Sequence, residues 1–187
     1  VFLSLTGPTS VMTSRVVGQC IPLYSEWPSL YLNFVVRDLP DRLQMVKSGL
    51  ASLAIVSPEE VPHEMDGKVL KPDRYILVGA RAWRGRRLKD ILQSERIVDF
   101  SESDSTTLRY LKASGLAHQP GKPRLYVNNN EALIQLFCRG AGFGTLTQEI
   151  ARPYLESGAL IALNGGEVME DPLALTWYPR PEMPKYF

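Results

Sequence analysis

The sequence has few of the side chains that most enzymes use for catalysis, with only two histidines and two cysteines in 187 residues. His63 and His118 lie in connector-like segments, and neither has further ligands at the spacing of a zinc site. Cys20 and Cys138 have no histidine nearby, so a nucleophile and its base would have to come from distant segments. These absences argue against an enzyme, and we expect no catalytic residue, no metal and no cofactor.

The sequence also lacks a strong net charge and long apolar runs. Its formal net charge of +1 argues against the basic footprint of a nucleic-acid-binding domain. We interpret its one basic cluster as an exposed loop and helix start: Arg81, Arg84, Arg86, Arg87 and Lys89. No run approaches the roughly 18–20 residues of a membrane span, and no signal peptide is recognisable. The missing span argues against a membrane partner. Both cysteines lie in apolar helical patterns typical of reduced core thiols, which favours a cytoplasmic protein.

A chain of 187 residues is long enough for one or two compact domains with a real hydrophobic core. Its two ends are abrupt. It starts inside an apolar strand pattern without an initiator methionine and stops at 184–187. We therefore expect a fragment of a longer protein.

The sequence does contain a repeated local order, in which a short apolar strand leads to a polar cluster and then to a helix that ends near glycine. The clusters follow predicted strands at Thr6–Ser10, Ser101–Ser105, Asn128–Asn130 and Thr147. In open α/β sheets, such clusters lie at the carboxyl ends of parallel strands, where small ligands bind. The order predicts an α/β fold with right-handed crossovers and a small-molecule-binding function.

Hydrophobic periodicity and turn residues predict the individual elements. Strands are predicted at Phe2–Leu5, Leu30–Val36, Leu53–Val56, Tyr75–Gly79, Arg96–Phe100, Leu125–Val127, Gly144–Leu146, Ala159–Leu163 and Leu173–Tyr178. Helices are predicted from Thr9 or Ser10 to Tyr24, and at Pro40–Gly49, Leu88–Leu92, Thr106–Ala113, Asn128–Arg139 and Thr147–Glu156.

Three segments carry more specific expectations. The first helix has an apolar row at i, i+4 spacing, and Pro22 should kink or end it. Glu59–Asp73 is acidic and weakly periodic, which predicts a connector. Gly140–Gly144 follows a helix and precedes a strand, the reverse of a dinucleotide-binding loop, so its glycines indicate a helix stop and close packing.

Taken in order, these segments resemble the effector-binding domain of LysR-type transcriptional regulators. Leu5–Thr9 resembles the first strand of the family with its small-Pro-Thr turn, and Trp27–Leu30 resembles its entry into the second strand. Leu43–Val56 resembles the "L..G.lDlai" signature, and Tyr75–Val78 the crossover strand. Val127–Leu163 resembles the long glycine-containing segment of the family. Together with Leu175–Trp177, this last segment is most similar to the branch that contains the arginine-responsive regulator, also called the chromosome replication initiation inhibitor.

The resemblance implies two Rossmann-like lobes joined by two crossover strands, as in type 2 periplasmic binding proteins. Lobe one would comprise residues 1–72 and 175–187, and lobe two residues 73–174. In the family a winged helix-turn-helix precedes this domain, and nothing in this sequence matches it, so DNA binding would depend on that missing N-terminal domain. The resemblance also implies a homodimer or homotetramer that pairs through Val11–Tyr24 and Leu30–Val36.

The polar residues after the strands are the candidate effector contacts. They are Pro8, Thr9, Ser10 and Ser57 in lobe one, and Ser101, Ser103, Asp104, Asn128, Thr145 and Thr147 in lobe two. Most of these residues have an alternative role that involves no ligand. Thr9, Ser10, Asp104 and Thr147 could be N-caps, and Asn128 with Glu131 has the spacing of a capping box. Ser57 could be a plain turn residue.

We interpret the chain as the effector-sensing and oligomerising part of a bacterial LysR-type regulator. A small carboxylate-bearing metabolite, such as an amino acid, would bind between the lobes, and the Asp104 carboxylate would suit an amine or guanidinium. Binding would shift the geometry of a regulator dimer on DNA. The alternative is a periplasmic solute-binding protein of a transporter, which shares the two-lobe fold. The segment that precedes Val1 in the parent gene, helix-turn-helix or signal peptide, distinguishes the two hypotheses.

Overall fold

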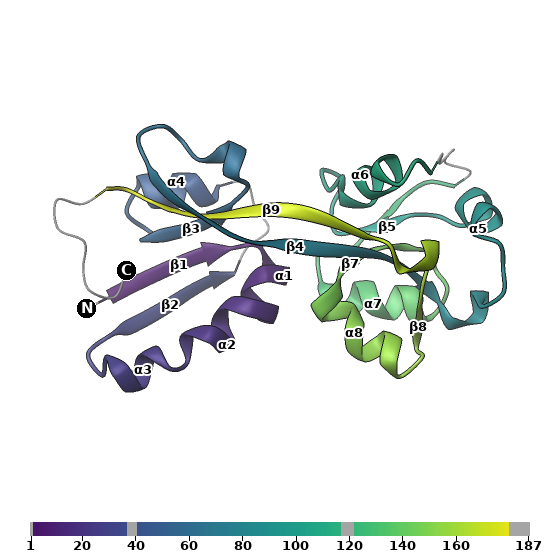
Figure 1. Ribbon diagram of the computed structural model, residues 1–187, viewed down its shortest axis with the longest axis horizontal. Coiled ribbons are helices and arrows are strands. Elements are labelled where there is room, and N and C mark those ends of the chain that lie inside the picture. Colours follow the sequence, from purple (N-terminus) through teal and green to yellow (C-terminus); the bar gives the residue numbers. More distant parts are fainter. Residues whose placement is uncertain (1, 37–40, 117–121, 180–187) are drawn as a thin grey trace. The chain divides into compact units, whose positions relative to one another are not determined.

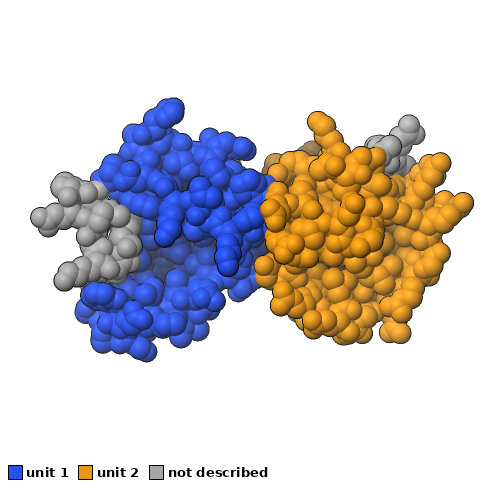
Figure 2. All heavy atoms as spheres, in the orientation of Figure 1, with its two compact units in different colours: residues 1–73, 171–187 blue, residues 74–170 orange. Residues whose placement is uncertain are grey.

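The computed structural model describes residues 2–36, 41–116 and 122–179. The chain forms two compact units, residues 1–73 with 171–187 and residues 74–170 (Figure 2). It passes from one unit to the other in two long strands, β4 (Asp66–Ala80) and β9 (Val168–Trp177) (Figure 1). The predicted α/β fold is confirmed. Four predicted features lie outside the described residues: Pro40, His118, the loop residues 119–121 and the tail 180–187.

The first unit is built on strands in the order β2-β1-β3-β9. Strand β1 (Phe2–Gly7) pairs in parallel with β2 (Tyr31–Val36) on one side and with β3 (Leu53–Val56) on the other. Strand β9 runs antiparallel to β3. Because β1, β2 and β3 are parallel, their carboxyl ends share one edge of the sheet.

Four short helical segments lie between β1 and β2. They are α1 (Thr9–Val11), a π-helical turn (Met12–Val16), α2 (Val17–Cys20) and α3 (Leu23–Glu26). The helix is interrupted at Ile21 and Pro22, which confirms the predicted break. Met12 is fully buried, but Tyr24 is 48% exposed, so the apolar row does not face the core over its whole length.

The second unit contains β5 (Val98–Asp99), β6 (Leu125–Tyr126), β7 (Gly144–Thr147) and β8 (Leu160–Ala162). Strands β5 and β6 are parallel, and a parallel bridge joins Ile97 to Phe143 ahead of β7. Strands β7 and β8 run antiparallel to β4. The other helices are α4 (Arg42–Lys47) in the first unit, and α5 (Leu88–Ser94), α6 (Thr106–Ala113), α7 (Asn130–Cys138) and α8 (Gln148–Glu156) in the second.

Buried apolar side chains form two core clusters in each unit. One cluster of the first unit includes Met12 and Ile55, and the other is built around Ala54. In the second unit, one cluster contains Trp83 and the other contains Phe137. Strands and helices pack on each other within each unit, which is the layered arrangement expected for α/β proteins.

The connector prediction for Glu59–Asp73 is wrong in its second half, because β4 already begins at Asp66. The first half of this strand is mostly solvent-exposed and therefore lacks the apolar alternation that reveals a strand in a sequence. Hydrogen bonds and an ion pair with other residues of the first unit hold this half of β4 in place instead. The Thr176 hydroxyl donates to the Asp66 carbonyl at 2.7 Å, and the Arg15 guanidinium lies 3.1 Å from the Asp73 carboxylate.

The glycines between α7 and β7 have the packing role predicted for them. Gly140 has a φ of +72° and ends α7. A Cβ at Gly142 would lie 2.5 Å from the Arg96 carbonyl oxygen, and one at Gly144 would lie 2.5 Å from that of Val98. Both distances are well inside van der Waals contact, so only glycine lets the two backbone segments approach this closely.

Gly144→Ala is expected to destabilise the domain, because the new Cβ meets backbone that cannot move without disturbing β5. The expected loss is about 1–3 kcal/mol in free energy of unfolding, measured by urea denaturation. Gly18→Ala is the matched control, since Gly18 is helical with nothing within 4 Å of an added Cβ. The control should gain about 0.5–1 kcal/mol. Equal effects of the two substitutions would contradict this packing account.

Candidate functional site

In the first unit, the carboxyl ends of β1 and β3 bring together Pro8, Thr9, Ser10 and Ser57, which we call the first polar edge. All four residues are half-buried. Pro8, with an extended backbone, occupies the N-cap position and makes no side-chain cap. The prediction that Thr9 or Ser10 is the N-cap is therefore wrong, because the helix starts one residue earlier. Both residues lie in the first turn, where backbone N–H groups point out of the helix end.

Ser57 follows β3 and begins a single 3₁₀ turn, Pro58–Glu60. Its backbone N–H donates to the Glu60 carboxylate at 2.9 Å, in a capping-box arrangement. The turn role that the sequence suggests for Ser57 is therefore present. In this capping box the Ser57 side chain also accepts the Glu60 backbone N–H, so the turn engages both polar groups of Ser57 at the first polar edge.

In the second unit, three strands that run in the same direction end at one edge. Parallel pairing of β5 with β6, and of Ile97 with Phe143 before β7, fixes this direction. We call the polar residues that follow these strand ends the second polar edge: Ser101, Ser103, Asp104, Asn128 and Thr147. Thr145 lies two residues before the end of β7. The structure thus gathers the polar clusters of each unit at one edge.

Asp104 has a structural role in the loop that follows β5. Its carboxylate accepts hydrogen bonds from the backbone N–H of Thr106 at 2.9 Å and of Phe100 at 3.2 Å. Ser105 occupies the N-cap position of α6, so the prediction of Asp104 as the N-cap is wrong by one residue, although Asp104 still satisfies an N–H of the first turn. The Ser101 and Ser103 hydroxyls lie 3.1 Å apart.

The predicted capping box of Asn128 with Glu131 is also wrong by one residue. Helix α7 begins at Asn130, and the Asn129 side chain accepts a hydrogen bond from the Ala132 N–H at 2.9 Å. Three consecutive asparagines made the correct register impossible to assign from sequence, since each is a good N-cap. Asn128 lies one residue before the cap, Asn129, and two residues after the end of β6 at Tyr126.

Thr145 and Thr147 differ in how their hydroxyl groups are satisfied. The Thr145 Oγ1 lies 3.1 Å from the Thr107 Oγ1, and Thr107 also accepts the Thr145 N–H at 3.1 Å. Thr147 is 2% exposed and occupies the N-cap position of α8, yet its Oγ1 has no hydrogen-bond partner within the described part of the chain. Such a buried orphan hydroxyl is rare in proteins and often marks a functional position.

An ion pair between buried Asp99 and half-buried Arg124 supports the second polar edge, and sequence reasoning missed both residues. Asp99 ends β5 with 3% exposure, and its carboxylate accepts hydrogen bonds from the Arg124 guanidinium. Arg124 also donates to the Asp104 carbonyl and so ties the 101–104 loop to the strand. Burial raises the pKa of the Asp99 carboxyl, and hydrogen bonds from Thr107 and Arg124 oppose this rise. The sequence signal that could have identified Asp99 is a charged residue directly after the apolar pair Ile97–Val98.

The described residues contain no candidate metal cluster and no candidate membrane-spanning helix. No group of three or more histidine, cysteine, aspartate or glutamate side chains there could hold a metal ion. In the same part of the chain, no helix is long and apolar enough to cross a membrane. Cys20 and Cys138 are free and only partly buried, which corrects the expectation of core thiols, and burial raises the pKa of both thiols.

The fold and the two polar edges define a two-unit α/β binding domain. The sequence matches the LysR substrate binding domain family over residues 3–187, so the chain belongs to that family. A search of curated proteins finds no match. The earlier resemblance to LysR-type regulators is therefore confirmed.

Solved structures with the same fold include several LysR-family proteins. The C-terminal domains of a LysR family protein from Agrobacterium tumefaciens align with a TM-score of 0.79 at 15% identity, covering 95% of this chain and 87% of that one. ArgP from Mycobacterium tuberculosis aligns with a TM-score of 0.80 at 15% identity, covering 97% and 62%. Full-length LysG from Corynebacterium glutamicum with bound effector Arg aligns with a TM-score of 0.76 at 16% identity, covering 97% and 63%. The chain thus spans less than two thirds of the last two proteins.

Arg124→Met is expected to destabilise the second unit by about 3–5 kcal/mol at pH 7, because it leaves the Asp99 charge buried and unpaired. The matched control is Arg87→Met, whose guanidinium pairs with Asp90 on the surface with 84% of the side chain exposed. The control should change stability by less than about 1 kcal/mol. Urea denaturation of the two variants measures both values.

The same variant should have a distinctive pH dependence. Without Arg124, the folded pKa of Asp99 rises further above its unfolded value of about 4, so the folded state binds the extra proton. The deficit relative to the parent chain should therefore be largest at pH 7 and shrink as the pH falls through the raised pKa of Asp99. A deficit that is constant between pH 4 and 7 would show that Asp99 ionisation is not its cause.

Proposed function

We propose that this domain senses a small carboxylate-bearing metabolite for a cytoplasmic, DNA-binding LysR-type regulator. The polar side chains of each polar edge are the candidate contacts to the effector. DNA binding belongs to a winged helix-turn-helix outside this chain. The family match favours this function over that of a transporter's solute-binding protein.

The observation that carries the proposal is the buried, unsatisfied hydroxyl of Thr147 at the second polar edge. The α8 backbone N–H groups that follow it and the positive end of the helix dipole favour a negative group at this position. A ligand carboxylate there would accept a hydrogen bond from Thr147 and thereby remove the cost of the orphan hydroxyl. Asn128 lies on the same edge and offers an amide.

The proposed role is binding without catalysis. Glu149, in the first turn of α8, has a buried Oε2 without a partner among the described residues, but the two other acidic groups near the second polar edge are engaged, Asp99 by Arg124 and Asp104 by backbone N–H groups. Neither carboxylate is therefore positioned as a general acid or base. The LysG structure contains arginine as its effector, which makes arginine and other amino acids the first compounds to test. Aromatic and dicarboxylic acids are the next group.

An effector found by a thermal-shift screen of these compounds should lose its stabilising effect in Thr9→Ala and in Asn128→Ala. A ligand at 100 times its Kd stabilises a protein by about 2.7 kcal/mol, which such a screen detects readily. Asn129→Ala is the matched control. It removes the α7 cap and should cost about 1 kcal/mol of stability while the effector still binds. Full stabilisation of both Thr9→Ala and Asn128→Ala would contradict the proposed contacts.

We also propose that the first unit forms a homodimer through its first helical segments and β2. Strand β2 is the edge strand at one end of the order β2-β1-β3-β9, so one of its sides is unpaired within the described residues. Several large apolar side chains on these segments are exposed: Ile21 at 61%, Tyr24 at 48%, Tyr31 at 70% and Val36 at 38%. Exposed apolar residues beside an unpaired strand edge are typical of an association surface.

Ile21→Lys and Tyr31→Lys are each expected to weaken this dimer, because a charge replaces apolar area in the contact. Size-exclusion chromatography with light scattering across a concentration series measures the effect. Val69→Lys is the control, since Val69 is 73% exposed in the first unit but belongs to β4 and not to the proposed helical segments or β2. A parent chain that stays strictly monomeric at high concentration would contradict the proposed dimer.

A further inference from the structure

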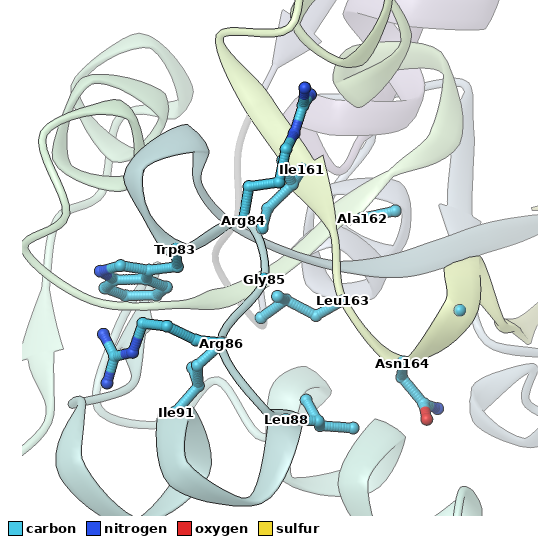
Figure 3. A pocket seen from close by; sticks show the side chains of 11 residues that line it. Trp83, Arg84, Gly85, Arg86, Leu88, Ile91, Ile161, Ala162, Leu163 and Asn164 are labelled. Carbon is cyan, nitrogen blue, oxygen red and sulfur yellow. The ribbon is translucent and has the colours of Figure 1, made fainter.

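The second unit contains a pocket of about 570 Å³ that includes none of the polar-edge residues. We call it the Trp83 pocket. Its lining comes from the turn and helix start after β4, and from β8 with the turn that follows it (Figure 3). Val78 of β4 pairs with Gly144 of β7 and also with Ala162 of β8. Strand β8 therefore lies on the opposite side of β4 from β7, whose end carries Thr147.

The Trp83 pocket combines an apolar lining with positive charge. Leu88, Ile91, Ile161 and Leu163 supply the apolar part, and the pocket volume is within the range of small-molecule sites, about 300–1,000 Å³. The lining also includes two arginines and no aspartate or glutamate. The pocket therefore favours a ligand with an apolar body and a negative group.

The two arginines of the pocket are in different situations. The Arg86 guanidinium donates to the Glu95 carboxylate at 2.7 Å and to the Ser94 hydroxyl at 2.8 Å, and it lies over the Trp83 ring at 5.5 Å. It is therefore already paired. The Arg84 side chain is exposed, and its guanidinium has no hydrogen bond or ion pair within the described ranges of the chain. Only its backbone N–H is engaged, donating to the Arg81 carbonyl at 3.1 Å. Arg84 is thus available to bind an anion.

The far wall of the pocket is held in one conformation. Asn164 has a positive φ of +52°, and Gly165 and Gly166 follow with +63° and +78°. The Asn164 amide donates to the Glu167 carboxylate at 2.6 Å, which anchors this turn. A fixed wall reduces the ordering cost of binding, as expected for a preformed ligand site.

We propose that the Trp83 pocket binds a small organic acid with an aromatic or branched apolar body, as a second ligand distinct from the effector. The carboxylate pairs with Arg84, and the apolar body packs on Ile161 and Leu163. This assigns a role to the part of the basic cluster that the proposed function leaves unused. The binding does not require the effector proposal to hold, because the two sites share no residue.

Tryptophan fluorescence tests the proposal directly, because only one of the three tryptophans lines this pocket. In the Trp27→Phe/Trp177→Phe chain, titration with 3-phenylpropionate should change the Trp83 emission saturably, with a Kd in the millimolar range or tighter. The uncharged 3-phenylpropanol should bind about tenfold more weakly, because it lacks the charge that pairs with Arg84. If the double variant does not fold, the indole N–H resonance of Trp83 in the parent chain provides the same readout.

Variants at two neighbouring arginines complete the test. Arg84→Gln should weaken 3-phenylpropionate binding about tenfold. Arg81→Gln is the control, because Arg81 is also exposed and basic but does not line the pocket, and it should bind like the parent. A non-saturable titration, equal binding of the alcohol and the acid, or unchanged binding in Arg84→Gln would each overturn the proposal.

Discussion

The second unit depends on the close approach of two backbone segments, 96–98 and 142–144. The Val98 N–H donates to the Phe143 carbonyl at 2.9 Å, and the Phe143 N–H donates to the Arg96 carbonyl at 3.0 Å. Glycines at 142 and 144 make this distance possible. The contact sets β5 parallel to β7, and for that reason α6 and α8 begin at the same edge. The polar residues after these strands therefore gather by backbone geometry, independently of their individual roles.

The second polar edge satisfies some of its polar groups internally and leaves others unsatisfied. Asp104 and Asn129 accept backbone N–H groups at the starts of α6 and α7. Arg124 pairs with Asp99 and also donates to the Asp104 carbonyl, which ties the 101–104 loop to β5. Thr147 keeps a buried hydroxyl without a partner in the described chain. Caps and buried pairs of this kind make the edge rigid, so the remaining groups are held in place before a ligand arrives. The edge is thus suited to recognition of a small polar molecule. The Trp83 pocket, with its apolar lining, is suited to a ligand with an apolar body.

Much of the fold was predictable because its strands are short and apolar and its helices end at glycines. Leu53–Val56 and Thr106–Ala113 have the predicted bounds, and Gly49 and Gly140 end helices with positive φ. The first half of β4 was not predictable, since it is exposed and held by pairing with residues about 100 positions later in the chain. For the candidate site, the sequence indicated which polar residues lie at the strand ends, but the positions of the helix caps are assigned by the hydrogen bonds. Asn128 and Asn129 look equivalent in a sequence, and so do Asp104 and Ser105.

The most direct test of the central claim is a crystal structure of this chain with a metabolite that stabilises it. The ligand carboxylate should lie within hydrogen-bond distance of the Thr147 hydroxyl at the start of α8, with a further contact from Asn128. A metabolite bound elsewhere, with Thr147 still unpaired, would contradict the assignment of the polar edges as the effector site.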